Sequence, residues 1–558
     1  MWPLASTVWL TLLSYLRRDT PSVLESVSCR PFLPKVFVDA PPTASHPLIR
    51  DATQALDAYL ATRFHSEAID TLSVGAVTSN GVLYEHNFGV LRANETGSAP
   101  VDSHSMYRIA SVSKMFTVLE GMILEQRGVL SWDDRVDKHL PEFKYTTRGL
   151  DPDQSYPSPD EEPITLAQLA SHMSGMGRDW PPGTATDWPH SMTGGGPPPT
   201  NGLPFPSREA VMQDMPNHPF ASVPWDQPIY SNVGIGVLGL ALAEADRAAS
   251  GRETALTHAE LLKRDIFDPM GLNGSHFLST DATKDKIVVG AEDSEYADMD
   301  FKNAMNPSGG QYTSLHDLMT IAQSLLNAKH PKSQLSPFSL RKWLRPMHAF
   351  EDNWTEVGLV WEIVKTHDSN GRARRLYQKM GNVASYHTAF TVNPTSGYGI
   401  VVMIGGSFSD SGELAYDAYE ILQPAMDAAL AEATADLYAG LWYAPSTNAD
   451  LKDSYAIINM EEWNLYGEDA LSKFGVQGPV VLRETRREEF RVDTGQAGRN
   501  GKRHVGCYVY WTILDEWGMR NNATVNAIYF TGSSNERRLH VPSLGVVMKR
   551  VSESEFRG

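Results

Sequence analysis

The most informative segment of the chain reads Tyr107-Arg-Ile-Ala-Ser-Val-Ser-Lys-Met-Phe-Thr117. It places the hydroxyl of Ser111 three residues before the ammonium of Lys114, and helical periodicity runs from Val112 to Gln126. Side chains three positions apart share one face of a helix. Serine is a weak nucleophile until a neighbouring base takes its proton, so this spacing predicts an activated serine that opens the helix.

The Ser-x-x-Lys pattern alone is not specific, because it recurs at Ser339-Leu-Arg-Lys342. Two other short motifs support the interpretation of Ser111. Tyr230-Ser-Asn232 is the only Tyr-x-Asn in the sequence, and a tyrosine close to lysines can ionise and act as a base. Lys379-Met-Gly381 precedes a β-rich run. A glycine there, on an edge strand, would let a substrate approach the backbone.

The order and surroundings of these motifs resemble those of the serine β-lactamase and penicillin-binding-protein superfamily. The Tyr-x-Asn element is similar to that of the class C-like branch, which includes D-aminopeptidases, esterases and acyltransferases. The resemblance is also carried by five longer stretches, namely residues 107–117, 130–136, 169–175, 307–314 and 358–361. The resemblance covers about residues 71 to 406, and the mechanism that it implies needs no metal or other cofactor.

The resemblance implies a role for each motif residue. Ser111 is expected to be the nucleophile, assisted by Lys114, with Tyr230 as the general base. Substrate binding and polarisation are expected from Asn232, Lys379, Gly381 and Asn382, where the backbone N–H groups of Ser111 and Asn382 form an oxyanion hole. His172 and His387 are interpreted as ordinary histidines that satisfy local hydrogen bonds.

One departure from the family pattern concerns the substrate. Family members usually have Thr or Ser where this chain has Met380, and that hydroxyl helps to bind a carboxylate. We therefore expect an ester or amide of a small molecule with a less polar acyl group as the substrate of a serine hydrolase. The alternatives are an acyltransferase in secondary-metabolite biosynthesis on the same scaffold, and an inactive binding protein.

Secondary-structure signals predict an α/β (α+β) sandwich with a central antiparallel sheet flanked by helices. Asn80-Gly81 between two β-rich runs predicts a hairpin, and further helices are expected at 51–63, 165–173, 235–247, 258–267, 314–327 and 414–435. Residues 177–206 are rich in Gly and Pro, which predicts a long loop, and we interpret it as a lid.

Three parts of the chain are predicted. Residues 1–25 are a signal peptide or an N-terminal extension, residues 45–435 the serine hydrolase domain, and residues 436–558 a C-terminal all-β domain, a layout that resembles fungal members of the superfamily. The β segments of the third part are expected at 455–460, 480–483, 504–514, 525–531 and 539–551.

Composition excludes several classes of partner. The net charge of −19 argues against nucleic acid, and no apolar run after the N-terminus is long enough to span a membrane. Two cysteines, Cys29 and Cys507, allow one disulfide but no zinc site built on several thiolates. The N-terminal apolar run and four glycosylation sequons, at Asn94, Asn273, Asn353 and Asn522, favour secretion over the cytoplasm.

Overall fold

The computed structural model describes residues 31–557, apart from 152, 154, 156, 200, 446–452, 462–463, 469–479, 494–497, 501–502, 507–513, 516 and 534–535. The predicted N-terminal segment 1–25, Cys29 and Cys507 lie outside these residues. The chain forms two compact units, one spanning Phe37–Ala429 and the other formed by Leu430–Gly558 with the residues before Phe37.

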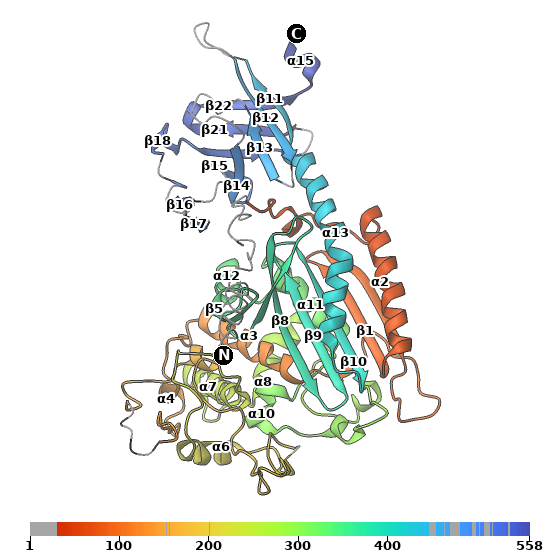
Figure 1. Cartoon of the computed structure of the whole chain (residues 1–558), viewed down its shortest axis with the longest axis vertical. Helices are drawn as coiled ribbons and strands as arrows, with labels where there is room; N and C mark the ends of the chain where they lie inside the picture. The colour runs from red at the N-terminus through yellow and green to blue at the C-terminus, as the bar shows by residue number, and fades with distance from the viewer. Residues whose placement is uncertain are drawn as a thin grey trace, which may run out of the picture. The chain divides into compact units, whose positions relative to one another are not determined.

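An antiparallel sheet is the centre of the first unit (Figure 1). In the part of the chain that is described, it has eight strands in the order β2-β1-β10-β9-β8-β7-β6-β5. The hairpin predicted at Asn80-Gly81 is confirmed by β1 and β2. The strands are β1 (Ile69–Thr78), β2 (Gly81–Gly89), β5 (Pro346–Ala349), β6 (Thr355–Gly358), β7 (Glu362–His367), β8 (Ala373–Val383), β9 (Tyr386–Asn393) and β10 (Tyr398–Gly406).

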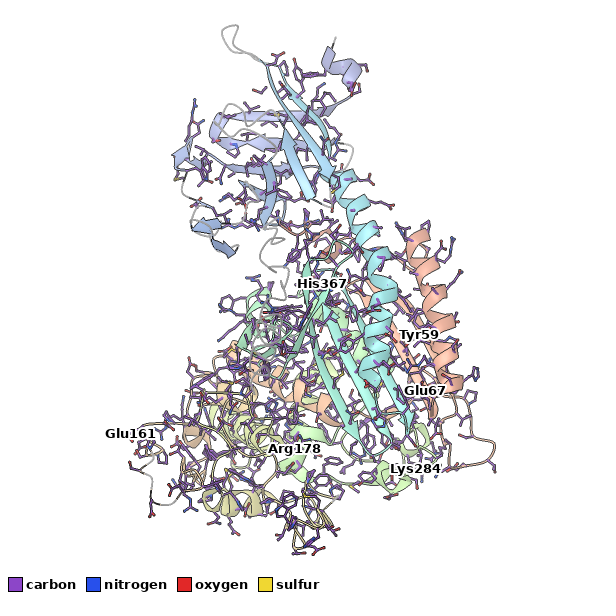
Figure 2. The ribbon with its side chains drawn as sticks, in the orientation of Figure 1. Tyr59, Glu67, Glu161, Arg178, Lys284 and His367 are labelled. Atoms are coloured by element: carbon purple, nitrogen blue, oxygen red, sulfur yellow. The ribbon has the colours of Figure 1, made fainter. Side chains whose placement is uncertain are left out.

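Helices cover both faces of this sheet. Helices α2 (Pro47–Ser66) and α13 (Ser411–Tyr438) lie on one face, where Tyr59 of α2 donates a hydrogen bond to Asp417 of α13 (Figures 1 and 2). Helix α11 (Leu315–Leu326) packs on the other face, against β1 and β10. The predicted sandwich of one antiparallel sheet and flanking helices is therefore confirmed.

The remaining helices of this unit form a second layer around α3 (Ser113–Gln126), whose residues Ser113–Leu124 are all buried. They are α4 (Val136–His139), α5 (Leu166–Ala170), α6 (Arg208–Asp214), α7 (Asn232–Ser250), α8 (His258–Leu262), α9 (Asp268–Met270), α10 (Lys302–Gly309) and α12 (Pro337–Trp343). Helix α5 is shorter than predicted because His172 has a φ of +61°, which ends helical geometry. The described residues of 177–206 contain no helix or strand, as predicted.

The second unit is rich in strands, as predicted. Among its described residues, eight strands close into an antiparallel barrel: β11 (Gly440–Ala444), β12 (Ser454–Glu461), β13 (Asn464–Glu468), β14 (Val480–Arg486), β15 (Glu489–Asp493), β20 (Ala527–Thr531), β21 (Arg538–Val541) and β22 (Val546–Val551). The expected single segment 539–551 is two strands, because Pro542 begins a 3-10 turn between them.

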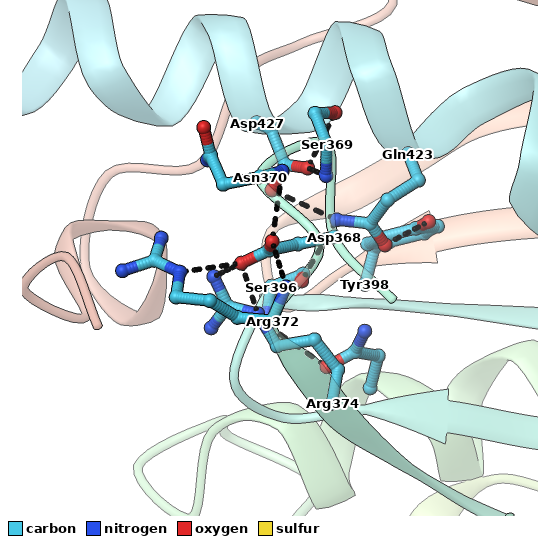
Figure 3. A network of polar contacts seen from close by, with 10 residues as sticks. Asp368, Ser369, Asn370, Arg372, Arg374, Ser396, Tyr398, Gln423 and Asp427 are labelled. Carbon is cyan, nitrogen blue, oxygen red and sulfur yellow. Dashed lines mark hydrogen bonds and ion pairs between the residues drawn. The ribbon is translucent and has the colours of Figure 1, made fainter. Parts of the chain in front are cut away.

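A buried polar network fixes the turn between β7 and β8 (Figure 3). Asp368 accepts backbone N–H groups of the turn and forms ion pairs with Arg372 and Arg374. Ser369 donates its N–H and its hydroxyl to Asp427 of α13, both at 2.8 Å. The turn that leads into β8, the strand of the Lys379 motif, is therefore bonded to α13.

Replacing Asp368 with Asn should destabilise the protein by about 3 kcal/mol, because the buried guanidinium of Arg374 loses its carboxylate. Urea denaturation followed by tryptophan fluorescence measures this loss. The matched control is Asp281→Asn, whose carboxylate is 99% exposed and pairs with Lys284. The control should change stability by less than about 0.5 kcal/mol. Equal effects of the two substitutions would contradict the structural importance of the network.

Candidate active site

Ser111 lies in a short 3-10 turn, Ala110–Val112, that leads directly into α3. The α-helix therefore begins at Ser113, two residues after the serine. The expectation that Ser111 opens this helix is wrong, because Ser111 lies in the preceding turn. The turn is strained, since Ala110 has a φ of +45°. Ser113 holds it by donating its hydroxyl to the carbonyl of Ala110 at 2.6 Å and accepting the N–H of Gln311 at 3.2 Å.

Lys114 is fully buried beneath this turn. Its Nζ donates hydrogen bonds to Oγ of Ser111 at 2.8 Å and to the carbonyl oxygen of Ser308 at 2.6 Å. Burial lowers the pKa of Lys114 below its ordinary value and outweighs the opposing effect of Tyr230. The lysine thus lies where it can share a proton with the serine.

Tyr230 precedes α7 and completes the group around Ser111. The Nζ atoms of Lys114 and Lys379 lie 5.0 and 5.1 Å from the centroid of its ring. Burial would raise the pKa of Tyr230, but the two positive charges outweigh it and bring the pKa down to about 8. A phenolate is therefore accessible near neutral pH.

His172 is part of this site, although it was expected to have only an ordinary role. Its ring stacks on Tyr230 with the centroids 4.6 Å apart. Its Nδ1 accepts the N–H of Ser231 at 3.1 Å, and the hydroxyl of Ser231 caps α7 by accepting the N–H of Gly234. The histidine does satisfy a local hydrogen bond, as expected, and by doing so it positions the tyrosine.

Asn232 lies at the first turn of α7, beside the start of the long loop. Its Nδ2 donates to Oδ1 of Asp179 at 3.0 Å. The guanidinium of Arg178, which Figure 2 labels, lies 5.1 Å from the Tyr230 ring centroid. Burial raises the pKa of Asp179 above its ordinary value. The loop 177–206 is thus attached to the site at its first residues.

Lys379 is 1% exposed and is paired with Glu362, a residue that belongs to none of the predicted motifs. Burial would lower the pKa of Lys379, but the Glu362 carboxylate raises it above its ordinary value. The other oxygen of Glu362 accepts the N–H of Met380 at 2.9 Å. The only sequence signal for Glu362 is its position directly after Gly358-Leu-Val-Trp361.

The expectation that Gly381 lies on an edge strand is wrong, because β8 lies between β7 and β9. Its pairing with β7 ends at Gln378, however, so the following residues have a strand on one side only. A Cβ at Gly381 would lie 2.1 Å from the carbonyl oxygen of Ile109 and 3.1 Å from the Ser111 nitrogen. Only glycine allows this strand to approach the Ser111 turn so closely.

Asn382 follows Gly381 on the same strand. Its Oδ1 is 2.8 Å from Nδ1 of His387, whose Nε2 is 3.2 Å from the carbonyl oxygen of Gly406. His387 therefore has the ordinary structural role that was expected. The oxyanion hole formed by the N–H groups of Ser111 and Asn382 stays a prediction, and Gly381 brings the strand of Asn382 close to the Ser111 turn.

The described residues contain no cluster of His, Cys, Asp and Glu that could hold a metal ion, and none of their helices is long and apolar enough to cross a membrane. The arrangement instead joins a hydroxyl, a buried amine and a phenol of lowered pKa. Such a group can perform nucleophilic and acid–base chemistry.

A family model described as Beta-lactamase matches residues 52–423. The chain belongs to the β-lactamase family. The predicted superfamily is therefore confirmed. The match covers the whole sheet and the motifs around Ser111, Tyr230 and Lys379.

Individual relatives agree with this assignment. The β-lactamase-like protein str5 of Strobilurus tenacellus is 42% identical over 226 residues, which cover 40% of this chain and 80% of the relative. The β-lactamase-like protein str6 of the same organism is 32% identical over 306 residues, 52% of this chain and 97% of the relative. An octameric penicillin-binding protein homologue from Pyrococcus abyssi has a similar fold, with a TM-score of 0.53, 18% identity and coverage of 89% and 99%.

Replacing Gly381 with Ala should slow acylation of Ser111 by about 100-fold, because the added Cβ pushes β8 away from the nucleophile. Stopped-flow or rapid-quench measurement with an activated ester gives this rate. Gly81→Ala is the matched control, since no atom lies within 4 Å of a Cβ at that strand residue. The control should keep the wild-type rate, and similar rates for both variants would contradict the argument.

Proposed function

We propose that this β-lactamase family member is a serine hydrolase that cleaves an ester or amide of a small molecule through an acyl-enzyme. The observation that carries the proposal is the 2.8 Å hydrogen bond from Lys114 to Ser111, next to a tyrosine whose pKa is about 8. An inactive binding protein would not need a buried lysine and an acidified phenol around one serine.

The reaction begins with transfer of the Ser111 proton to Tyr230, with the charge of Lys114 stabilising the phenolate that accepts it. The serine oxygen attacks the substrate carbonyl, and the N–H groups of Ser111 and Asn382 bind the oxyanion. Tyr230 then protonates the leaving group. In the second half, the same phenolate activates water, which releases the acyl group and regenerates Ser111.

Met380 sharpens the choice of substrate. Its side chain lies against the start of α13, where its Cε is 3.3 Å from the position of a Cβ on Gly412. Replacing the usual Thr or Ser with Met380 therefore acts mainly through the loss of the hydroxyl. Without that hydroxyl and with Lys379 already paired to Glu362, a neutral substrate is favoured over a carboxylate.

Acyl transfer to a metabolite alcohol or amine is the second candidate. The loop 177–206 supports it, because Arg178 and Asp179 at its start contact Tyr230 and Asn232. A loop held at the site can exclude water from the acyl-enzyme and let an acceptor compete with hydrolysis. Product analysis with candidate acceptors separates transfer from hydrolysis.

Incubation with a panel of activated acyl esters should add one acyl mass to the wild-type protein, as measured by intact-protein mass spectrometry. Ser111→Ala should show no adduct, because it lacks the nucleophile. Ser339→Ala is the matched control, since Ser339 begins the second Ser-x-x-Lys of the chain and lies in α12. Absence of an adduct from every ester would refute the proposed function.

The acylation rate should rise about tenfold per pH unit below pH 8 and level off above it, because the deprotonated Tyr230 is the active form and its pKa is about 8. Tyr230→Phe should lose most of the rate and this dependence. Tyr84→Phe is the control, because the Tyr84 hydroxyl donates a hydrogen bond to Asp57 of α2 and takes no part in the site. This variant should keep the wild-type pH profile. A flat profile in the wild type would exclude Tyr230 as the base.

A further inference from the structure

A cavity of about 410 Å³ lies next to Tyr230. Its wall is mainly apolar and comes from β6, β7 and the segments that face them. The lining residues with apolar side chains are Pro228, Phe350, Val357, Val360, Ile363 and Val364. This volume lies within the range of small-molecule sites, which are usually apolar with a few polar groups.

The charged groups in the cavity wall are already paired. Glu356 forms ion pairs with Lys365 and Arg375, and Glu362 forms one with Lys379. A charged ligand would therefore find no free counter-charge among the lining residues, while it would lose its hydration. These contacts favour an uncharged ligand.

Two of the lining residues carry a buried ring nitrogen that has no hydrogen-bond partner among the described residues, namely Nε2 of His172 and Nε1 of Trp361. The side chains are 5% and 0% exposed. Because Nδ1 of His172 accepts the N–H of Ser231, the neutral ring carries its proton on Nε2. Leaving such donors unpaired costs free energy, which a ligand with a hydrogen-bond acceptor would recover.

Tyr230 connects this cavity with the nucleophile. Its ring centroid lies 5.0 Å from Nζ of Lys114, which donates a hydrogen bond to Ser111, and Tyr230 also lines the cavity. In the proposed mechanism the leaving atom must come within hydrogen-bond distance of the Tyr230 hydroxyl to receive its proton. A substrate with its carbonyl at Ser111 can therefore extend its leaving group past Tyr230 into the cavity.

We infer that this cavity binds the leaving group of the substrate, and that this group is an uncharged, largely apolar alcohol or amine with a carbonyl or ether oxygen that accepts hydrogen bonds from His172 and Trp361. The inference rests on the proposed function. In the step concerned, the bond from the acyl carbon to the leaving oxygen or nitrogen breaks and its electron pair stays on that atom. The atom takes the proton of Tyr230, which becomes a phenolate, and the acyl group stays on Ser111.

The test uses the full chain and four butanoate esters that differ only in the alcohol: methyl, 4-isopropylbenzyl, 4-acetylbenzyl and 4-carboxybenzyl. Acylation is followed as alcohol release in the first turnover. The 4-acetylbenzyl ester should react at least 10-fold faster than the methyl ester and about 10-fold faster than its isopropyl isostere, because only its carbonyl satisfies the buried donors. The 4-carboxybenzyl ester should be the slowest of the three benzyl esters.

Two variants locate the effect. Val364→Phe fills the cavity and should reduce the ratio of the 4-acetylbenzyl rate to the methyl rate by at least 10-fold. Trp361→Phe removes one N–H and should reduce the ratio of the acetyl rate to the isopropyl rate. Val82→Phe is the matched control, because Val82 is an exposed valine of β2, and both ratios should stay at their wild-type values.

The outcomes separate the two claims. Absence of any butanoyl adduct on Ser111, from all four esters, would overturn the proposed function. An adduct from all four at rates that do not depend on the alcohol would overturn the inference and leave the function standing. If Val364→Phe instead slows acylation by methyl esters of long acyl chains but not by those of short ones, the cavity binds the acyl chain. That outcome also overturns the inference.

Discussion

The buried ammonium of Lys114 is the constraint on which the site depends. A charged or polar nitrogen in the interior must be hydrogen-bonded, and its bonded acceptors are Ser111 on the preceding turn and the carbonyl of Ser308. The strained turn at Ala110 and the long buried helix α3 hold the nitrogen in place. Tyr230 is then close enough for the lysine charge to lower its pKa.

Pairing of charges gives this site its chemical character. The positive charge of Lys379 is balanced by Glu362, and the acidic Asp179 is bonded by Asn232. Among the described residues, two that line the cavity, His172 and Trp361, keep a buried ring nitrogen without a hydrogen-bond partner. A site of this kind discriminates by shape and by hydrogen-bond acceptors rather than by net charge.

Local signals predicted much of the fold and the site. Asn80-Gly81 predicted the β1–β2 hairpin because this dipeptide is a common turn between two β-rich runs, and the apolar spacing after Ser111 predicted α3. Contacts between distant segments were not predictable in this way. Glu362 reaches Lys379 from a neighbouring strand, and His172 reaches Tyr230 across 58 residues of chain, so neither shows a local pattern.

The amino-acid sequence by itself determined the family, the nucleophile motif and its lysine, because their three-residue spacing is a property of one helix. Tertiary structure decided the rest. The ionisation of Tyr230 depends on two lysines from different elements, the approach of β8 depends on the missing Cβ of Gly381, and the cavity exists only where β6, β7 and the segment before α7 meet. Electrostatic fields and close packing depend on distances in space, which spacing along the chain does not encode.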